Sequence, residues 1–264
     1  MTLSRLADAY DHLLLDLDGC VWVGEQATPR AQQAIAELRA AGKNIAFVTN
    51  DARWTAEEFV RRLWGHGIQA ALEEIVTSGG AVQHVLAERY EGASAVVIGS
   101  QAVHRHVRDA GVRAVNGTDF ASRANVVVVS GHDAFDFAEL REATLALHGG
   151  AELLATDRDV TFPTPAGPCP GTGAILAAVE AAGSTRAESV GKPAPQLFRT
   201  ALDRLPPGRA LVIGDRLDAD IEGAAAAGLD SALVLSGVTG ANQAAADERP
   251  LAFAPTLAEL VLDG

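Results

Sequence analysis

Short apolar runs alternate with helix-like segments along the whole chain, and this alternation constrains the fold more than any other feature of the sequence. Each apolar run ends in Gly, Asn, Thr or Asp, and the segment after it carries apolar residues at helical spacing. Strands that alternate with helices form mostly parallel sheets covered on both faces. We therefore predict an α/β fold of the doubly wound type. Strands are expected at 12–17, 44–49, 95–98, 126–130, 153–156, 210–214 and 232–235, and helices at 30–41, 55–66, 102–110, 138–148, 173–182, 221–227 and 241–246.

The alternating units number roughly ten, which is more than one domain of typical size holds, so we predict two sheets. Residues with catalytic potential lie near both ends of the chain, and the block between them has few charged residues at its strand ends. We predict a catalytic core formed by residues 1–80 and 186–264, with a second, inserted α/β domain at 81–185 that covers the site as a cap. The Pro- and Gly-rich stretch 163–171 is typical of a shaped loop.

The charge balance excludes some classes of partner. The 264 residues include 34 acidic and 21 basic side chains, which gives a formal net charge of -13. Nucleic acids and anionic membranes bind basic surfaces, so we expect neither as a partner. No apolar run has membrane-spanning length and the polar start does not resemble a signal peptide, so we expect the protein in the cytoplasm. Cys20 and Cys169 offer no basis for a disulfide framework or a zinc site.

Two carboxylates follow the first predicted strand, in the sequence Asp16-Leu17-Asp18-Gly19. Side chains alternate along a strand, so Asp16 and Asp18 point the same way when both lie at or beyond its carboxyl end, where open α/β sheets bind ligands. Carboxylates this close repel each other unless a cation lies between them or one is protonated, and both states suit phosphoryl transfer. Gly19 would let the backbone approach a phosphate. A helix cap or an Asp-Gly turn is the alternative interpretation.

Polar residues also follow other predicted strands. Thr49 and Asn50 end the second strand with a hydroxyl and an amide that can both bond to a phosphate oxygen; the alternative is a cap for the next helix. Lys192 lies between a Gly and a Pro at a predicted helix entrance, where its charge can neutralise phosphate. A solvated surface lysine is the alternative for Lys192.

A further strand ends in Gly214-Asp215, and Asp220 follows at the start of a helix. Carboxylate oxygens suit a hard cation, so Asp215 is a candidate magnesium ligand. Asp220 is placed to hold Asp215, a metal-bound water or Lys192 from behind. We expect Asp218 to cap the helix instead, because acidic residues are favoured at a helix start.

The motifs, in this order, resemble those of the haloacid dehalogenase superfamily, in its NagD-like phosphatase branch, which has a large α/β cap after the second motif. The resemblance spans nearly the whole chain. Within the branch, the sequence looks closest to actinobacterial enzymes assigned to glycerol 3-phosphate. The resemblance to the superfamily rests on Asp16-Leu17-Asp18-Gly19, Thr49-Asn50, Gly191-Lys192-Pro193 and Gly214-Asp215 through Asp220. The resemblance to the NagD-like branch is supported by Val76-Thr77-Ser78, residues 155–173 and Leu235-Ser236-Gly237-Val238.

The resemblance implies a role for each motif residue. Asp16 would be the nucleophile, and Asp18 would be the general acid and base. Mg²⁺ would be the cofactor, held by Asp16, Asp215 and the backbone carbonyl of Asp18, with Asp220 behind them. Phosphate would be bound by Gly19, Thr49, Asn50 and Lys192, which surround the oxygens that gain charge in the transition state.

The sequence departs from the family at two positions near these motifs. Cys20 stands where the family often has Thr, and without a nearby His it is typical of a buried packing residue. Asp51 stands where a second Asn is common, and because it adds negative charge beside a phosphate pocket, we expect it to point away or to cap a helix.

The predicted cap should decide which substrate is used, because the core contacts mainly the phosphoryl group. Asp157, Arg158 and Asp159 are candidates for contacts with the leaving group; the alternative is that they only shape a turn. An acidic loop of this kind favours a polar, uncharged leaving group such as a polyol or a sugar.

The sequence therefore predicts a magnesium-dependent phosphomonoester hydrolase that acts through an aspartyl-phosphate. The expected partner is a small-molecule phosphate ester, with glycerol 3-phosphate or a sugar or polyol phosphate as the leading candidate. Phosphoglycolate, pyridoxal phosphate and nucleoside monophosphates are alternatives, and a regulator that binds phosphate without activity is a remote one. The oligomeric state is not encoded in these patterns; a homodimer is one candidate.

Overall fold

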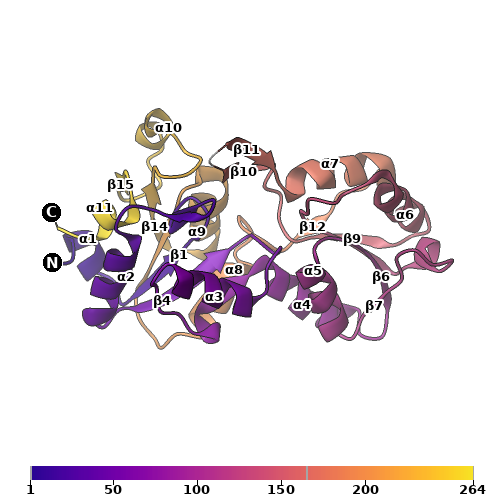
Figure 1. Ribbon diagram of the computed structural model, residues 1–264, viewed down its shortest axis with the longest axis horizontal. Helices are drawn as coiled ribbons and strands as arrows, with labels where there is room; N and C mark the ends of the chain where they lie inside the picture. Colours follow the sequence, from indigo (N-terminus) through magenta and orange to yellow (C-terminus); the bar gives the residue numbers. More distant parts are fainter. Residues whose placement is uncertain (1, 165, 264) are drawn as a thin grey trace.

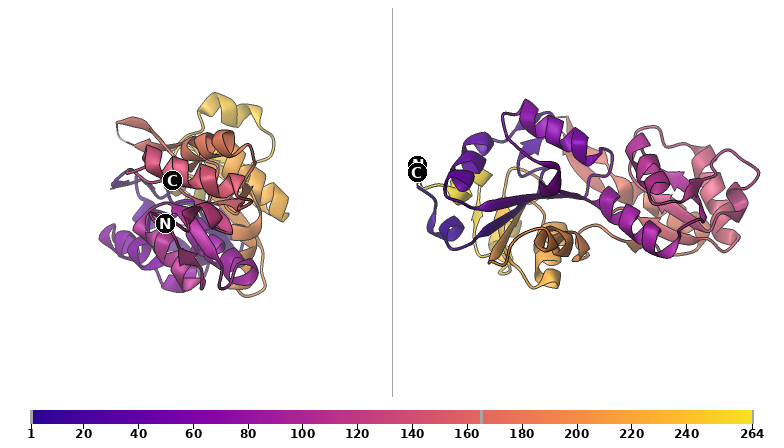
Figure 2. Two further views of the ribbon diagram at one scale, coloured as in Figure 1. Left: turned by 90° about the vertical axis from the view of Figure 1, so that its right-hand side faces the viewer. Right: turned by 90° about the horizontal axis from the view of Figure 1, so that it is seen from below.

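The computed structural model describes residues 2–164 and 166–263. The molecule is elongated and has two lobes, each built around a parallel sheet (Figure 1). The described ends of the chain lie together at the far end of the first lobe, where the amide of Asp263 donates to the carbonyl of Thr2 at 3.0 Å (Figure 2).

The first lobe contains a six-stranded sheet in the order β15-β14-β13-β1-β4-β5, and all its neighbouring strands are parallel. Its strands are β1 (His12–Leu15), β4 (Asn44–Thr49), β5 (Ile75–Thr77), β13 (Ala210–Gly214), β14 (Asp230–Val234) and β15 (Phe253–Ala254), and β2 (Trp22–Val23) and β3 (Gln26–Ala27) form a hairpin beside it. The helical segments of this lobe are α1 (Arg5–Asp8), α2 (Ala31–Ala40), α3 (Ala56–Gly65), η1 (Leu72–Glu74), α8 (Gln196–Asp203), η3 (Leu217–Ile221), α9 (Glu222–Ala227), α10 (Ala241–Ala246) and α11 (Leu257–Val261).

Strand β1 shows why the strands of this lobe are apolar throughout. Leu13 and Leu15 pack into the core between the sheet and helices α2, α3 and α11, whereas Leu14 packs on the opposite face with α8 and α9. A strand covered on both faces has no solvent side, so the sequence shows a continuous apolar run. The polar residues that follow such a run are therefore held at the edge of the sheet.

The second lobe contains a five-stranded parallel sheet in the order β12-β9-β8-β6-β7, with α4 and α5 on one face and α6 and α7 on the other. Its strands are β6 (Ser94–Ile98), β7 (Arg113–Ala114), β8 (Val126–Val129), β9 (Glu152–Ala155) and β12 (Glu188–Ser189). Its helical segments are α4 (Ser78–Arg89), α5 (Gln101–Asp109), η2 (Ala121–Arg123), α6 (Phe137–His148) and α7 (Thr172–Gly183). The hairpin of β10 (Thr161–Thr164) and β11 (Gly167–Pro170) projects toward the first lobe (Figure 1).

The predicted fold class, a doubly wound α/β core with a second α/β unit, is confirmed. The predicted strands and helices lie within about two residues of their predicted bounds, but helix α4, with 12 residues, was not predicted. The predicted loop 163–171 is most of the β10–β11 hairpin, of which residue 165 lies outside the described residues. The division at 81 and 185 stays a prediction; α4 begins at Ser78, and β12 pairs with β9 from beyond residue 185. Within the described chain, no helix has both the length and the apolar character needed to cross a membrane.

Candidate active site

A cavity lies where the carboxyl ends of the strands of both sheets meet, which is the usual place for ligands in open α/β sheets. Most of the sequence-predicted site residues line it, although they come from segments far apart in the chain. These lining residues are Asp16, Asp18, Thr49, Asn50, Asp157, Asp159, Lys192, Asp215 and Asp220, whereas Gly19 and Arg158 lie outside the lining.

Lys192 joins two carboxylates in the floor of the cavity. Its ammonium group donates to Asp16 Oδ1 at 2.5 Å, to Asp220 Oδ1 at 2.6 Å and to the carbonyl of Val48 at 3.1 Å. All three charged side chains are almost completely buried. Burial alone would lower the pKa of Lys192, but the two carboxylates outweigh it and raise this pKa above its ordinary value. Lys192 is therefore a fixed positive charge beside the predicted nucleophile.

Asp220 has both carboxylate oxygens occupied by the protein. Oδ1 accepts from Lys192, and Oδ2 accepts from the backbone amides of Asp215 and Arg216 at 3.2 and 3.1 Å. This arrangement agrees with the predicted supporting position of Asp220 behind the site. Asp218 does not cap the helix as expected, because its carboxylate pairs with the guanidinium of Arg216 instead.

Asp215 lies between two glycines. A Cβ at Gly19, whose φ is +90°, would be 2.4 Å from Asp215 Oδ2, and a Cβ at Gly237 would be 1.9 Å from the same atom. Both positions therefore need glycine. Gly19 does not have the predicted phosphate-binding position, because its amide donates to the carbonyl of Trp22 and its carbonyl accepts from Ser236. Its main effect is to make room for Asp215.

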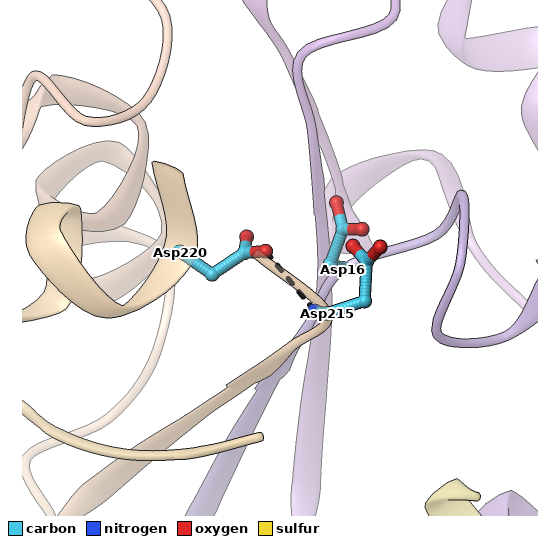
Figure 3. A group of neighbouring side chains, drawn as sticks. All are labelled: Asp16, Asp215 and Asp220. Atoms are coloured by element: carbon cyan, nitrogen blue, oxygen red, sulfur yellow. Dashed lines mark hydrogen bonds between the residues drawn. The ribbon is translucent and has the colours of Figure 1, made fainter. Parts of the chain in front are cut away.

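The two oxygens of Asp215 differ sharply. Oδ2 accepts from the backbone amide of Val238 at 2.6 Å, whereas Oδ1 is buried and has no hydrogen-bond partner among the described residues. Figure 3 shows the carboxylates of Asp16 and Asp215 side by side, with Asp220 reaching toward them from the opposite side. Burial, followed by the charge of Asp220, raises the pKa of Asp215 to about 7.

These carboxylates fit a magnesium ion. Asp16, Asp215 and Asp220 each offer an oxygen, and the three atoms lie within 4.8 Å of one another. Mg²⁺ prefers such oxygen ligands, and it would give Asp215 Oδ1 the partner that the protein does not supply. Since Asp220 is occupied by Lys192 and two amides, Asp16 and Asp215 are the side chains best placed to hold the ion.

Asp18 is half-buried and lines the cavity. Its Oδ1 accepts a hydrogen bond from the indole Nε1 of Trp22 at 2.9 Å. Burial, followed by the charge of Asp51, raises the pKa of Asp18 to about 6, against the opposing effects of Trp22 and Arg53. A carboxyl group with this pKa exchanges a proton readily near neutral pH, which suits an acid and base catalyst.

Thr49 and Asn50 lie at the end of β4 as predicted, but their side chains act differently. Thr49 Oγ1 accepts from the amide of Asp51 at 3.0 Å, a bond that leaves the hydroxyl proton to be donated to a phosphate oxygen. The amide group of Asn50 instead bonds to the backbone of Lys192 on both sides and donates to Asp159 at 3.1 Å. Asn50 thus holds the Lys192 loop, and its side chain is not placed as a phosphate donor.

Asp51 lines the cavity, although we expected it to point away or to cap a helix; the cap of α3 is Thr55. Its oxygens accept from the guanidinium of Arg53 at 2.9 and 2.8 Å, and Oδ1 also accepts from the backbone amide of that residue. The ring of Phe162, from the β10–β11 hairpin, lies 4.1 Å from the same guanidinium. Arg53 therefore compensates the extra negative charge and contacts the second lobe at the same time.

The three predicted specificity residues have three different surroundings. Asp157 is buried, and it accepts from the hydroxyls of Thr156 and Thr172 and from the amide of Asp159. Burial, followed by the charge of Asp159, raises the pKa of Asp157 to about 7. Arg158 lies outside the lining of the cavity and pairs with Glu180 at 2.8 Å, so the structure does not bring it to the site, and its contact with the leaving group stays a prediction.

Asp159 faces the cavity and meets a core arginine. The guanidinium of Arg216 lies 3.5 Å from Asp159 Oδ1 and also donates to the carbonyl of Thr161 at 3.1 Å. Burial raises the pKa of Asp159, and the charge of Arg216 opposes the rise. Of the three predicted specificity residues, Asp159 is the best placed to contact a leaving group.

Sequence reasoning missed several residues that line the cavity, among them Arg53, His132, Asp133, Phe162 and Arg216. His132 and Asp133 follow strand β8 closely, so the rule that found Asp16 could also have found them. Nothing in the sequence alone marks Phe162.

Comparisons with known proteins identify the family of this chain. A family model described as haloacid dehalogenase-like hydrolase matches residues 13–113, and a second, HAD-hydrolase-like, matches residues 189–260. The D-glycerol 3-phosphate phosphatase of Mycobacterium tuberculosis is 39% identical over 240 residues, which cover 90% of this chain and 67% of the relative. This chain belongs to the haloacid dehalogenase-like hydrolases.

Human chronophin is a further relative, 35% identical over 89% of this chain and 84% of its own. The solved structure of the M. tuberculosis glycerol phosphate phosphatase in complex with magnesium matches with a TM-score of 0.89 at 38% identity, over 99% of this chain and 79% of that one. This haloacid dehalogenase-like hydrolase is accordingly an enzyme of the phosphatase type.

Proposed function

We propose that this enzyme hydrolyses small polar phosphate monoesters in a magnesium-dependent reaction, through a phosphoaspartate on Asp16. The observation that carries the proposal is the pairing of two features in one cavity: Asp16 held by Lys192, and the unpartnered Asp215 Oδ1 beside it. A solvated turn or a structural ion pair would leave no buried oxygen without a partner.

The nucleophilic step can be assigned to named atoms. Lys192 occupies Asp16 Oδ1, which leaves Oδ2 to attack phosphorus. Lys192 and the hydroxyl of Thr49 stabilise the phosphoryl oxygens, where charge accumulates during transfer. Mg²⁺, held by Asp16, Asp215 and the carbonyl of Asp18, would neutralise charge that otherwise keeps an anionic phosphate out of this acidic cavity.

Asp18 acts twice in the proposed cycle. It first donates its proton to the leaving oxygen as the phosphorus–oxygen bond breaks, and it becomes a carboxylate. It then takes a proton from the water that hydrolyses the phosphoaspartate, so that phosphate is released and the acid is restored. A pKa of about 6 allows both states to be populated during turnover.

We propose glycerol 3-phosphate, or another polyol or sugar phosphate, as the substrate. The side of the cavity formed by the second lobe carries the carboxylates of Asp133 and Asp159, which repel a second anionic group. This disfavours phosphoglycolate, whose leaving group bears a carboxylate. The M. tuberculosis relative named for D-glycerol 3-phosphate supports the same choice.

The test is phosphate release from p-nitrophenyl phosphate and from a panel of metabolites, with and without Mg²⁺. Wild-type protein should be active only with the metal, Asp16→Asn should lose essentially all activity, and Asp119→Asn, at an exposed position of the second lobe, should match wild type. A wild-type protein that binds phosphate but releases none would support the inactive regulator instead. Equal activity in Asp16→Asn would refute the phosphoaspartate.

Two finer predictions from the sequence belong to this proposal. We propose location in the cytoplasm, from the acidic composition of the chain. We also propose that a homodimer forms, which light scattering of the purified protein would measure directly.

A further inference from the structure

The indole of Trp22 lies directly behind the predicted general acid. Its Nε1–H donates to Asp18 Oδ1 at 2.9 Å, and the side chain is completely buried. The backbone of Trp22 is tied to the same segment, because its amide donates to the carbonyl of Leu17 at 3.1 Å and its carbonyl accepts from Gly19 at 2.7 Å. Trp22 thus contacts Asp18 through its side chain and bonds to the residues on either side of Asp18 through its backbone.

One face of helix α3 holds this indole in place. The ring of Phe59 is stacked on it at 6.3 Å with an interplanar angle of 7°, the guanidinium of Arg62 lies 4.2 Å from it, and the ring of His66 lies at 5.8 Å. Residues three and seven positions apart lie on the same side of a helix, so Phe59, Arg62 and His66 contact the indole from one side. Arg62 also donates to the carbonyl of Gly24 in the turn between β2 and β3.

The chemistry of an indole decides what this contact does to the acid. An indole N–H is a donor and cannot accept, so the oxygen that faces it must present a lone pair. When Asp18 is neutral, its proton is therefore confined to Oδ2. A carboxyl group without this contact could carry the proton on either oxygen.

We propose that Trp22 is a positioning residue that fixes Asp18 so that Oδ2 carries the proton given to the leaving oxygen. As Asp16 Oδ2 bonds to phosphorus and the leaving bond breaks, the proton moves from Asp18 Oδ2 to the leaving oxygen. In hydrolysis of the phosphoaspartate, the same oxygen takes a proton from the attacking water. Oδ1 keeps its bond to the indole throughout, and the inference rests on the role proposed for Asp18.

The first test uses Trp22→Phe, which keeps an aromatic ring but removes the N–H. The value of kcat/KM is compared for p-nitrophenyl phosphate and for an alkyl phosphate that wild type cleaves, such as glycerol 3-phosphate. An alkoxide needs a proton to leave and p-nitrophenolate does not, so the loss should be roughly tenfold or more for the alkyl ester and below about threefold for the aryl ester. An equal loss for both esters would overturn the proposal.

Two further variants separate the possible failures. Phe59→Leu loosens the stack but keeps the N–H, so it should lower Tm without changing the ratio of the two losses. Asp18→Asn should show the same dependence on the leaving group as Trp22→Phe. If Asp18→Asn shows none, the role of Asp18 fails; if it does and Trp22→Phe does not, only the inference about Trp22 fails.

A spectroscopic test does not depend on turnover or on the folding of Trp22→Phe. The chain has three tryptophans, so ¹⁵N-labelled protein gives three indole signals. The Trp22 signal should move upfield in Asp18→Asn, because a bond to a charged acceptor is stronger than one to an amide. The signals of Trp54 and Trp64 should stay in place. A Trp22 signal that does not move would overturn the proposal.

Discussion

Both lobes contain a parallel sheet covered by helices, yet the buried carboxylates at their strand ends differ in whether the protein supplies hydrogen-bond partners for them. In the first lobe, Asp215 follows β13 with a buried oxygen that has no partner among the described residues, close to the carboxylate of Asp16. In the second lobe, Asp157 follows β9 with both oxygens bonded, to two threonine hydroxyls and a backbone amide.

The difference indicates that Asp215 is kept to bind a ligand, whereas Asp157 stabilises the fold of the same cavity. A buried polar atom without a partner costs on the order of 1–3 kcal/mol, so a fold keeps one only where a ligand supplies the missing contact. The first lobe accepts this cost at Asp215, whereas the second lobe satisfies its buried carboxylate internally. Removing the unsatisfied carboxylate of Asp215 should therefore lower activity but raise stability without metal, whereas removing a satisfied group such as Lys192 should lower both.

The largest effect should come from Lys192→Met, which leaves Asp16 and Asp220 buried without their shared cation. We expect a loss of about 3–5 kcal/mol in the free energy of unfolding, because breaking a buried ion pair leaves uncompensated charge inside the protein. We also expect no measurable activity. Lys43 is the other lysine of the chain, and its ammonium group donates to the carbonyl of Asp8 at the surface. Lys43→Met should therefore lower the free energy of unfolding by less than about 1 kcal/mol. Urea unfolding measures both, and equal losses would contradict the comparison.

Asp215→Asn should lower activity by roughly 10²–10³-fold and raise the Mg²⁺ concentration needed for half-maximal rate. The same variant should raise Tm in metal-free buffer, since it removes one of three crowded carboxylates. Asp218→Asn, three residues away and mostly exposed, is the matched control and should change neither quantity. A lower metal-free Tm for Asp215→Asn would show that the site is not under electrostatic strain.

Asp157→Asn should change how stability depends on pH more than it changes activity. The pKa of Asp157 is about 7 in the folded protein and about 4 when unfolded, so the folded state keeps a proton that the unfolded chain releases. The contribution of this carboxyl is therefore greatest below pH 4 and is lost as pH rises to 7, on the order of 1.4 kcal/mol per pKa unit. Asp157→Asn should reduce the decrease in the free energy of unfolding as pH rises.

Urea unfolding at pH 5 and pH 8 tests this expectation. The wild-type free energy should drop more between the two values than that of Asp157→Asn, and Asp119→Asn serves as an exposed control. Identical slopes for wild type and Asp157→Asn would mean that the internal hydrogen bonds keep Asp157 ionised.

Arg158→Ala should have the smallest effect. The side chain pairs with Glu180 outside the cavity, and partly exposed pairs contribute less than about 1 kcal/mol. KM and kcat for every substrate should stay within about twofold of wild type. A larger change in KM would return Arg158 to the specificity residues.

The sequence predicted where the reactive groups meet, but not how each side chain points. Strand ends converge at one edge of a parallel sheet, so Asp16, Lys192 and Asp215 could be placed together from periodicity and motif order. The orientation of Asn50 and Arg158 depends on partners distant in the chain, Lys192 and Glu180, which no local pattern reveals.

Short secondary-structure elements were not predicted, because they also depend on partners distant in the chain. Strand β12 has two residues and forms only because β9 offers its edge, so nothing in its own sequence marks it. The contact of Trp22 with Asp18 was missed because it depends on the tight turn between them, in which Gly19 donates to the carbonyl of Trp22, although the two residues are only four apart.

The peptide bond between Asp215 and Arg216 couples two events that are usually described separately. One of these neighbours faces the metal site, and the other grips the β10–β11 hairpin through Thr161. Because the two residues are adjacent, we expect a shift of this loop to move both side chains together. We therefore expect selectivity between substrates to vary with the identity of the divalent ion.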